Sequence, residues 1–485
     1  MLISLFSRSW VTGISGINFA YRLQERNPEL SYVILENRHE LGGTWSLFKY
    51  PGIRSDSDLF TFGFPWRPWA EKNSIAEGSL ITSYLKESAE MYGIDKKMEF
   101  NHHVNGASWS SEHKTWTFDV TANKTEQKTF RSRFFMLCTG YYDYEQPLKS
   151  PIPGLENFQG KVVHPQFWPE DLEYADKKVV IIGSGATTAT LVPAMAKEAE
   201  HVTMLQRSPS YIMSQPTEDG MEKFIRRWFS GSLQHVLIRW KWIFIPFALS
   251  TFCQWFPKLG QKMFKAATTP QLPPTIKHDP HFQPRYYPFE QRVCLCPDAD
   301  FYKALRSGKA SMETGVIEDI TANAIKLTSG VELNPDIIIT ATGLKLRVGG
   351  GMKVDVDGKP YDVPDHFVWK GVMLEDLPNA AFVIGYVDAS WTLGADATAQ
   401  MVCRILKQMK KEGAVEIVPR MTTKEKRNMK EKPLLNLKST YVQSGAKVLP
   451  KAGDRGQWAA RSYYMKDILM AWFGDIKTGT VWVSG

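Results

Sequence analysis

Short apolar runs that end in small residues recur along this chain and predict buried parallel strands. Such runs occupy residues 134–140 (FFMLCTG), 179–183 (VVIIG) and 336–343 (DIIITATG). The second run leads into Gly183 and Gly185, a helical stretch over 186–196 and another strand over 201–206. Strand, glycine turn, helix and strand in this order are typical of a dinucleotide-binding unit.

A weaker form of the same pattern opens the chain. In WVTGISG (10–16), Gly13 and Gly16 take the second and third glycine places of a phosphate-binding turn. A helix is predicted over 17–24, and the run SYVILE (31–36) predicts the strand that follows. A glycine pair alone is a weak signal, and the surrounding order of elements makes a nucleotide site the better interpretation.

The residues that end the two second strands predict different nucleotides. Glu36 ends the first, where a carboxylate suits the free ribose 2′-hydroxyl of a nucleotide such as FAD. Arg207 ends the other, where a cation suits the 2′-phosphate of NADP(H), although a plain surface arginine is the alternative. An acidic first site and a basic second site are the pattern of a flavoprotein reduced by NADPH.

These elements predict an α/β fold with two Rossmann-like dinucleotide-binding domains, the NADP domain inserted in the FAD domain. We expect residues 1–147 to form the first part of the FAD-binding domain and 148–334 the NADP-binding domain, with a helical apolar insertion near 215–285. Residues 335–485 then complete the FAD-binding domain and close the chain. A length of 485 residues fits more than one hydrophobic core.

Composition narrows the class of protein. The formal net charge is +8, but the basic runs at 407–413 and 422–433 contain glutamates, which favours solvated helix faces over a nucleic-acid surface. The five cysteines include only one close pair, Cys294 and Cys296, so no metal site is expected and a reducing compartment fits. The opening MLISLF is too short for a signal-peptide core, and we expect a cytoplasmic location, with membrane association as the alternative.

The most apolar run of the chain is 236–256. Its uninterrupted part, 242–250, is shorter than the roughly 20 residues of a spanning helix, and it contains Pro246. A core helix or a lid over the substrate is one interpretation. The other is an interfacial helix, with Arg239 and Lys241 near lipid headgroups and a peripheral membrane contact through 236–256.

One motif connects these units to a known family. In FQGKVVHPQFWP, five fixed positions match the Baeyer–Villiger fingerprint: Phe158, Gly160, His164, Trp168 and Pro169. With GGTW (42–45), YPGIRSDSD (50–58), PFEQRVCLCPDAD (288–300) and YVDASWTLGAD (386–396), the chain resembles the class B flavin monooxygenases of the Baeyer–Villiger type, closest to the ethionamide-monooxygenase branch.

The resemblance implies an FAD-dependent NADPH monooxygenase that uses O₂ to insert oxygen next to a ketone carbonyl through a C4a-peroxyflavin. A small hydrophobic ketone or sulfide is the implied substrate. The related N- or S-oxygenating reaction is an alternative, and a non-catalytic NADP-binding protein with an impaired FAD site is a hypothesis of another class. Protein that stays colourless when FAD is added would favour the latter.

Residue roles follow from the same resemblance. Arg292 is the implied active-site arginine, Asp56 the carboxylate that holds it, and Trp391 a wall on the substrate side of the flavin; the fingerprint is implied to couple NADP position to domain motion. The expected cofactor-binding residues are Gly13, Ser15, Gly16, Glu36, Gly43, Thr44, Trp45, Arg54, Asp56, Val104, Gly183, Ser184, Gly185, Ala186, Thr187, Thr188, Arg207 and Ser208.

The chain departs from the family at three places. Val11 replaces the first turn glycine, and the polar residues 7–9 stand where strand residues are expected, so the first strand should be poorly formed. Either these opening residues come from a wrong start or splice boundary, or the chain binds FAD weakly; glycine at position 11 is then expected to tighten FAD binding. Thr188 replaces a glycine, and Gln291 a common lysine, which leaves the NADP phosphate more to Arg207.

Overall fold

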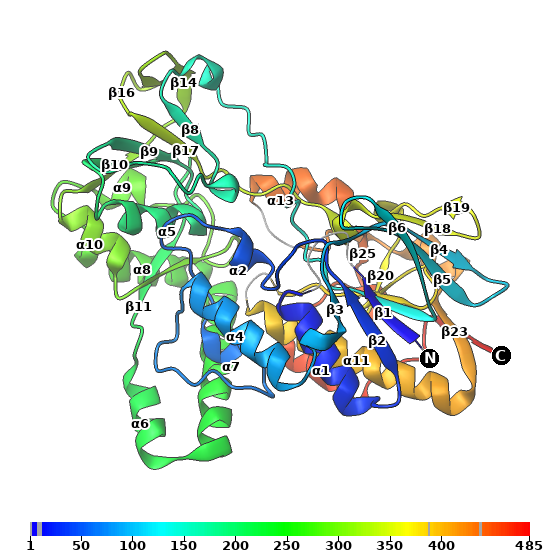
Figure 1. Cartoon of the computed structure of the whole chain (residues 1–485). Helices are drawn as coiled ribbons and strands as arrows, with labels where there is room; N and C mark the ends of the chain where they lie inside the picture. The colour runs from blue at the N-terminus through cyan, green and yellow to red at the C-terminus, as the bar shows by residue number, and fades with distance from the viewer. Residues whose placement is uncertain (1, 7–11, 387–388, 436–438) are drawn as a thin grey trace.

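The computed structural model describes residues 2–6, 12–386, 389–435 and 439–485. Two five-stranded parallel sheets dominate the fold (Figure 1). The first has the order β22-β7-β1-β2-β3, with β1 Leu2–Phe6, β2 Ser31–Leu35, β3 Met98–Glu99, β7 Phe134–Leu137 and β22 Ala380–Phe382. The second has the order β13-β10-β9-β17-β8, with β8 Lys161–Val163, β9 Lys178–Ile182, β10 His201–Gln206, β13 Ala310–Thr314 and β17 Ile337–Thr340.

The second unit is an insertion in the first. Strand β22 pairs in parallel with β7, so the C-terminal part of the chain rejoins the first sheet after the second sheet is complete. This confirms two dinucleotide-binding domains with one inserted in the other. The predicted boundary after residue 334 needs a correction, because β17 pairs with β8 and β9 in the second sheet. The chain therefore leaves the inserted domain after Thr340.

A third sheet covers the first. Its order is β19-β18-β4-β5-β6, with β4 His102–Ser110, β5 Thr115–Ala122, β6 Glu126–Ser132, β18 Lys353–Val356 and β19 Lys359–Pro360. Trp109, Trp116 and Phe118 are buried beneath it. The remaining strands form smaller sheets. One has three strands, β14 Ile317–Ile320, β15 Ile325–Leu327 and β16 Glu332–Leu333. The others are pairs: β11 Ile212–Gln215 with β12 Cys294–Pro297, β20 Val368–Trp369 with β21 Met373–Leu374, β23 Ala414–Pro419 with β26 Thr480–Ser484, and β24 Glu431–Lys432 with β25 Ala452–Gly453.

Each nucleotide turn leads into a helix. The helices are α1 Ile14–Arg26, α2 Thr44–Leu47, α3 Leu59–Phe62, α4 Gly78–Met91, α5 Ala186–Met195, α6 Gly220–Trp228, α7 Gly231–Trp255, α8 Pro257–Thr268, α9 His278–His281, α10 Asp300–Arg306, α11 Trp391–Glu412, α12 Thr423–Asn428, α13 Thr440–Gly445 and α14 Tyr464–Phe473. Helix α1 turns Ile17, Phe19 and Leu23 into the core and packs against α11. It begins three residues earlier than predicted, directly after Gly13.

Residues 7–11, and with them Val11, lie outside the described residues. The strand before them is present: β1 pairs with β2 on one side and β7 on the other. The expectation of a poorly formed first strand is therefore wrong for residues 2–6.

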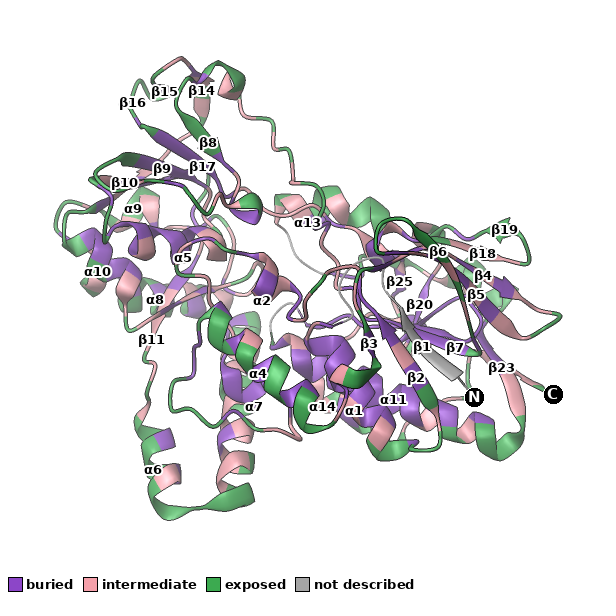
Figure 2. Ribbon diagram, in the orientation of Figure 1, coloured by how far each residue is buried: buried purple, intermediate pink, exposed green. Residues whose placement is uncertain are grey.

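The helical insertion projects from the body of the molecule. Helices α6 and α7 form an antiparallel pair at the lower left of Figure 1, and Figure 2 shows exposed residues at the turn that joins them. Helix α7 runs unbroken through Pro246 for 25 residues, so it is longer than the apolar run predicted. Among the described residues it is the one helix long and apolar enough to cross a membrane, and only 22% of its most apolar window is buried.

Candidate active site

The first glycine turn brings two predicted cofactor segments together. Gly13 has extended backbone and stands directly before α1, and Gly43 has a φ of +58°. A side chain at Gly43 would place its Cβ 3.2 Å from the Cα of Gly13. Thr44 and Trp45 follow in α2, and the Thr44 hydroxyl lies 2.7 Å from that of Tyr144. A surface without side chains at the start of a helix fits a pyrophosphate group.

Glu36 is completely buried at the end of β2. Its carboxylate accepts hydrogen bonds from the backbone N–H and hydroxyl of Thr12, at 3.0 and 2.9 Å, and from the backbone N–H of Arg38 at 2.9 Å. Burial raises the pKa of Glu36 above its ordinary value, and these hydrogen bonds act in the opposite direction. Three of the four lone-pair positions are thus used, and one remains for a ribose hydroxyl.

The second turn requires glycine at Gly183 and has open space at Gly185. Gly183 has a φ of +144°, and a Cβ there would collide with the carbonyl oxygen of Ala341. At Gly185, directly before α5, a Cβ would meet nothing within 4 Å, so the space in front of this helix is open. Ala186 and Thr187 begin the helix beside that space. The arrangement fits the pyrophosphate of a second nucleotide.

Arg207 and Ser208 are exposed at the end of β10, next to this turn. The backbone N–H of Gly183 donates to Leu205, which fixes the turn beside that strand end. Within the described parts of the chain, the Arg207 side chain donates one hydrogen bond, to the hydroxyl of Thr440 at 3.3 Å, so its guanidinium can bind a phosphate. Ser184 and Ser210 share a hydrogen bond of 2.9 Å. Thr188, at the third glycine place, is fully buried, and its hydroxyl has no hydrogen-bond partner among the described residues.

Arg292 and Asp56 form an ion pair between segments far apart in sequence. Asp56 belongs to the loop at 50–58, and Arg292 lies two residues before β12. One Nη of Arg292 donates to Oδ1 of Asp56, while Oδ2 is buried without a hydrogen-bond partner among the described residues. The carboxylate raises the pKa of Arg292 further above its ordinary value, so the guanidinium is a fixed cation. The unused oxygen is available to a bound group.

This ion pair stands in the wall of an apolar cavity of about 350 Å³. Arg292 faces the cavity, and its side chain keeps 47% of its surface accessible. The other walls come from α7, from the strand β12, from Tyr386 and the segment 389–393, and from 463–465. Most of the lining is apolar, which together with a few charged groups is the usual composition of a small-molecule site.

Trp391 does not line this cavity. Its indole N–H donates to the Ser15 hydroxyl at 2.8 Å, and its ring stacks on Tyr141 with a centroid separation of 5.3 Å. It therefore lies beside the first nucleotide turn, and its place on the substrate side of the flavin stays a prediction. Its neighbours Ser390 and Leu393 line the cavity instead.

Two further predicted cofactor residues have other surroundings. The guanidinium of Arg54 pairs with both carboxylate oxygens of Asp300, and its contact with a cofactor stays a prediction. The side chain of Val104, on β4 of the third sheet, is fully buried in the core, and its contact with a cofactor stays a prediction. Gly16 is buried within the first turns of α1.

The fingerprint residues lie at the edge of the second sheet. Phe158 packs into its core, and a Cβ at Gly160 would come within 2.5 Å of the Asp336 carbonyl. His164 follows β8, and its Nδ1 accepts from the backbone N–H of Gln166 at 3.2 Å. Its Nε2 is buried without a hydrogen-bond partner among the described residues, and burial lowers the pKa of this ring. Trp168 and Pro169 are half-buried beyond it.

The opposite wall of the cavity carries charged groups that were not among the predicted site residues. Lys241 forms an ion pair with Asp219, and both line the cavity. Asp58 lines it too, and burial raises the pKa of this carboxyl to about 6. Behind them, both carboxylate oxygens of Glu222 are buried without a hydrogen-bond partner among the described residues.

Replacing Glu222 with glutamine is expected to raise the melting temperature at pH 8 and to change it little at pH 5. Burial raises the pKa of Glu222 from its ordinary 4.5 to about 7, so the folded state favours the neutral form. Stability is therefore lost as the pH rises through 7, and glutamine avoids that loss. We expect a gain of about 1 °C for each kcal/mol, because the unfolding entropy of a chain of this length is about 1 kcal/mol/K. Thermal scans at both pH values measure it.

Glu218→Gln, at an exposed carboxylate on the same segment, is the matched control for this variant. A similar gain at pH 5 and pH 8 would show that the charge of Glu222 is not the cause.

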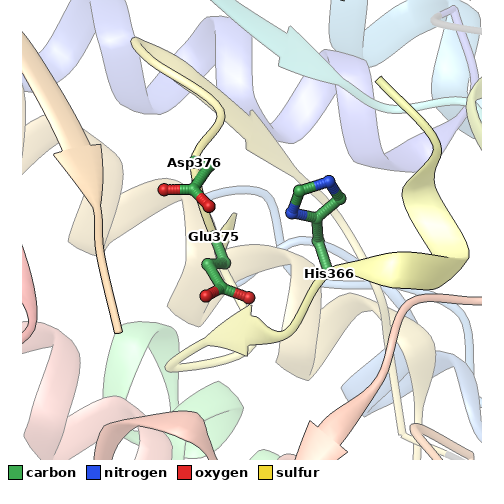
Figure 3. Close-up of side chains that lie close together, drawn as sticks. All are labelled: His366, Glu375 and Asp376. Carbon is green, nitrogen blue, oxygen red and sulfur yellow. The ribbon is translucent and has the colours of Figure 1, made fainter. Parts of the chain in front are cut away.

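Outside the cavity, His366, Glu375 and Asp376 lie close together (Figure 3), with ligand atoms within 4.8 Å of one another. Lys426 pairs with Glu375 at 2.7 Å, and the ring of His366 stacks on Tyr361. An ammonium group therefore already neutralises the most buried carboxylate of the cluster, and we assign no cation to it.

Comparisons with known proteins agree with this architecture. The family model described as flavin-binding monooxygenase-like matches residues 63–242, and one described as an NAD(P)-binding Rossmann-like domain matches residues 12–71. The chain is 43% identical to the FAD-containing monooxygenase EthA of Mycobacterium tuberculosis, over 96% of this chain and 94% of that protein. It is also 43% identical to the probable FAD-binding monooxygenase AlmA of Acinetobacter baylyi, over 94% and 91% of the two chains.

Solved structures share the fold at lower sequence identity. Cyclohexanone monooxygenase from Rhodococcus sp. Phi1, bound to NADP⁺, matches with a TM-score of 0.71 at 17% identity, over all of this chain and 99% of that one. The polycyclic ketone monooxygenase of Thermothelomyces thermophila matches with a TM-score of 0.72 at 17% identity, over 100% and 89% of the two chains.

Proposed function

Since this chain belongs to the family of FAD-containing monooxygenases, we propose that it is a Baeyer–Villiger-type enzyme that uses NADPH and O₂ to convert a hydrophobic ketone into an ester or lactone. One oxygen atom of O₂ enters the product next to the carbonyl carbon, and the other leaves as water, while NADPH and a proton supply the two electrons and the hydrogen atoms. The fixed Arg292 cation at the apolar cavity is the observation that supports this proposal.

The residues present fit both cofactors. The glycine surfaces at Gly13 and Gly43, and the open space before Gly185, suit two pyrophosphates, and Arg207 is placed for a 2′-phosphate. FAD, when bound and reduced by NADPH, would supply the electrons that activate O₂. The fold neighbour bound to NADP⁺ supports the choice of coenzyme.

The chemistry assigned to this chain's own residues is electrostatic. Arg292 donates hydrogen bonds from a rigid guanidinium to oxygen atoms that carry negative charge during the reaction. Asp56 holds the guanidinium at the cavity wall and keeps it protonated. The apolar walls bind the substrate and exclude water, which strengthens every charge interaction inside.

The test is product analysis with ¹⁸O₂. Purified protein with FAD and NADPH is incubated with a panel of cyclic and linear ketones and with sulfides, and the products are identified by mass spectrometry. We expect esters or lactones that carry one ¹⁸O atom. Sulfoxides from the sulfides, with no ester from any ketone, would overturn the proposal in favour of S-oxygenation. Protein that stays colourless with added FAD would show that the chain does not act as a flavoenzyme.

A further inference from the structure

The helical insertion exposes many large apolar side chains to solvent. Helices α6, α7 and α8 form one continuous segment over 220–268, which we call the insertion face. Trp228 at the end of α6 is 67% exposed, and Trp255 at the end of α7 is 74% exposed. Phe224, Leu233, Phe256 and Leu259 are exposed along the same segment. Exposed apolar surface of this extent marks a site of contact with another body.

The exposed charge of the insertion face is of one sign. Residues 220–268 contain eight lysines and arginines and one acidic residue, Glu222, which is buried, whereas the whole chain has 59 basic and 51 acidic residues. Arg239 and Lys241 are turned inward, where they bond to backbone carbonyls and to Asp219. Arg227, Lys258 and Lys262 are exposed and have no carboxylate partner among the described residues. The insertion face is therefore apolar and positively charged at once.

The exposed apolar side chains and the positive charge together indicate what kind of partner the insertion face binds. A second copy of the chain, in a symmetric contact, would bring the same positive charge against itself. An anionic lipid surface attracts the basic side chains and accepts the apolar ones between its headgroups. Arg239 also ties α7 to the backbone carbonyls of Phe60 and Gly63 outside the insertion, so the helix lies against the surface and does not cross it.

The cavity opens on the same side of the molecule. Ile245 and Phe247 of α7 line the cavity and are themselves exposed, as is Tyr463, whose ring lies 5.5 Å from that of Phe247. The rim of the cavity is thus part of the insertion face or directly next to it.

We propose that the insertion face docks on an anionic lipid bilayer and that the cavity takes a membrane-dissolved apolar substrate from it. The docking is inferred only from the apolar and basic side chains of the insertion face. The substrate route rests on the proposed function, and it narrows the substrate class to ketones or sulfides with enough hydrocarbon to partition into a bilayer.

Flotation of the full-length protein, loaded with FAD, tests the docking without any use of activity. We expect the protein to float with vesicles of equal parts phosphatidylglycerol and phosphatidylcholine, to float much less with phosphatidylcholine alone, and to be released from the anionic vesicles by high salt. The triple variant Arg227→Gln, Lys258→Gln and Lys262→Gln should bind the anionic vesicles on the order of 100-fold more weakly.

Two further variants make this result specific. Phe224→Ser combined with Trp228→Ser should weaken binding to the anionic vesicles through the apolar contact. Lys424→Gln, Arg427→Gln and Lys430→Gln remove the same charge at exposed positions in and beside α12 and should leave binding unchanged. The flavin absorbance and melting temperature of each variant show that it is folded.

Three outcomes overturn the docking proposal: protein that stays unbound with both kinds of vesicle, equal weakening by the control triple variant, or a stable dimer that the insertion-face substitutions dissociate.

The substrate route has its own measurement. With vesicles present, the insertion-face triple variant should show a raised KM for a long-chain ketone and an unchanged kcat and KM for a short water-soluble one. If the substitutions change the KM for the two ketones equally, the proposed substrate route is wrong, whereas the docking proposal still stands. Vesicle binding without turnover of any substrate would instead mean that the proposed function fails.

Discussion

Replacing Arg292 with alanine is expected to lower the rate of product formation by about 10²–10³ while NADPH still reduces the bound FAD. The guanidinium faces the cavity and is the fixed cation of its wall. Its removal takes away a preorganised donor where oxygen carries negative charge, whereas hydride transfer does not use it. Anaerobic stopped-flow absorbance measures the reduction, and product yield per NADPH measures the oxygenation.

Arg285→Ala removes an exposed arginine from the segment that contains Arg292. It should change neither the reduction of FAD nor the formation of product. In Asp56→Asn, the arginine keeps its charge and loses the carboxylate that holds it, so we expect a smaller loss of product formation. If Arg292→Ala oxygenates as fast as the parent protein, the assignment of this arginine to the active site is wrong.

Replacing Arg207 with alanine is expected to raise the KM for NADPH on the order of 10- to 100-fold and to leave the KM for NADH nearly unchanged. A hydrogen bond to a charged group contributes about 1.5–3 kcal/mol, which corresponds to that range. Only NADPH carries the 2′-phosphate that the guanidinium would bind. Initial rates of FAD reduction at varied concentrations of each coenzyme measure the effect.

Arg306→Ala, at an exposed arginine on α10 of the same domain, serves as the control and should leave both KM values unchanged. An equal increase for NADPH and NADH would mean that Arg207 shapes the turn and does not contact the phosphate.

The elements around the two nucleotide turns could be predicted from sequence because each is local. The run VVIIG became β9, and HVTMLQ became β10 with the predicted bounds. Apolar runs of four to six residues between turn signals leave few alternatives to a buried strand. The strand at 337–340 was predicted as well, but its sheet was not, because the partners of a strand lie far away in sequence.

The site itself was less accessible to sequence reasoning. Arg292 and Asp56 are separated by more than 200 residues, and only the resemblance to a family singled them out. Tyr441 interacts with the Arg292 charge from a third segment, without any pattern that could have pointed to it. Lys241 was singled out for lipid headgroups, yet its ammonium is buried against Asp219. A side chain's direction on a helix depends on what that helix packs against.

One helix separates the cavity from the surroundings of the protein. The backbone and side chains of an α-helix form a layer of about 10–12 Å, and α7 presents Ile243 inward and Phe244 outward at neighbouring positions. The substrate range of this enzyme should therefore depend on the medium in which it is measured. A detergent micelle, a lipid vesicle and plain buffer make different contacts with the outer side of α7. Each therefore alters the space that is available to a substrate on the inner side.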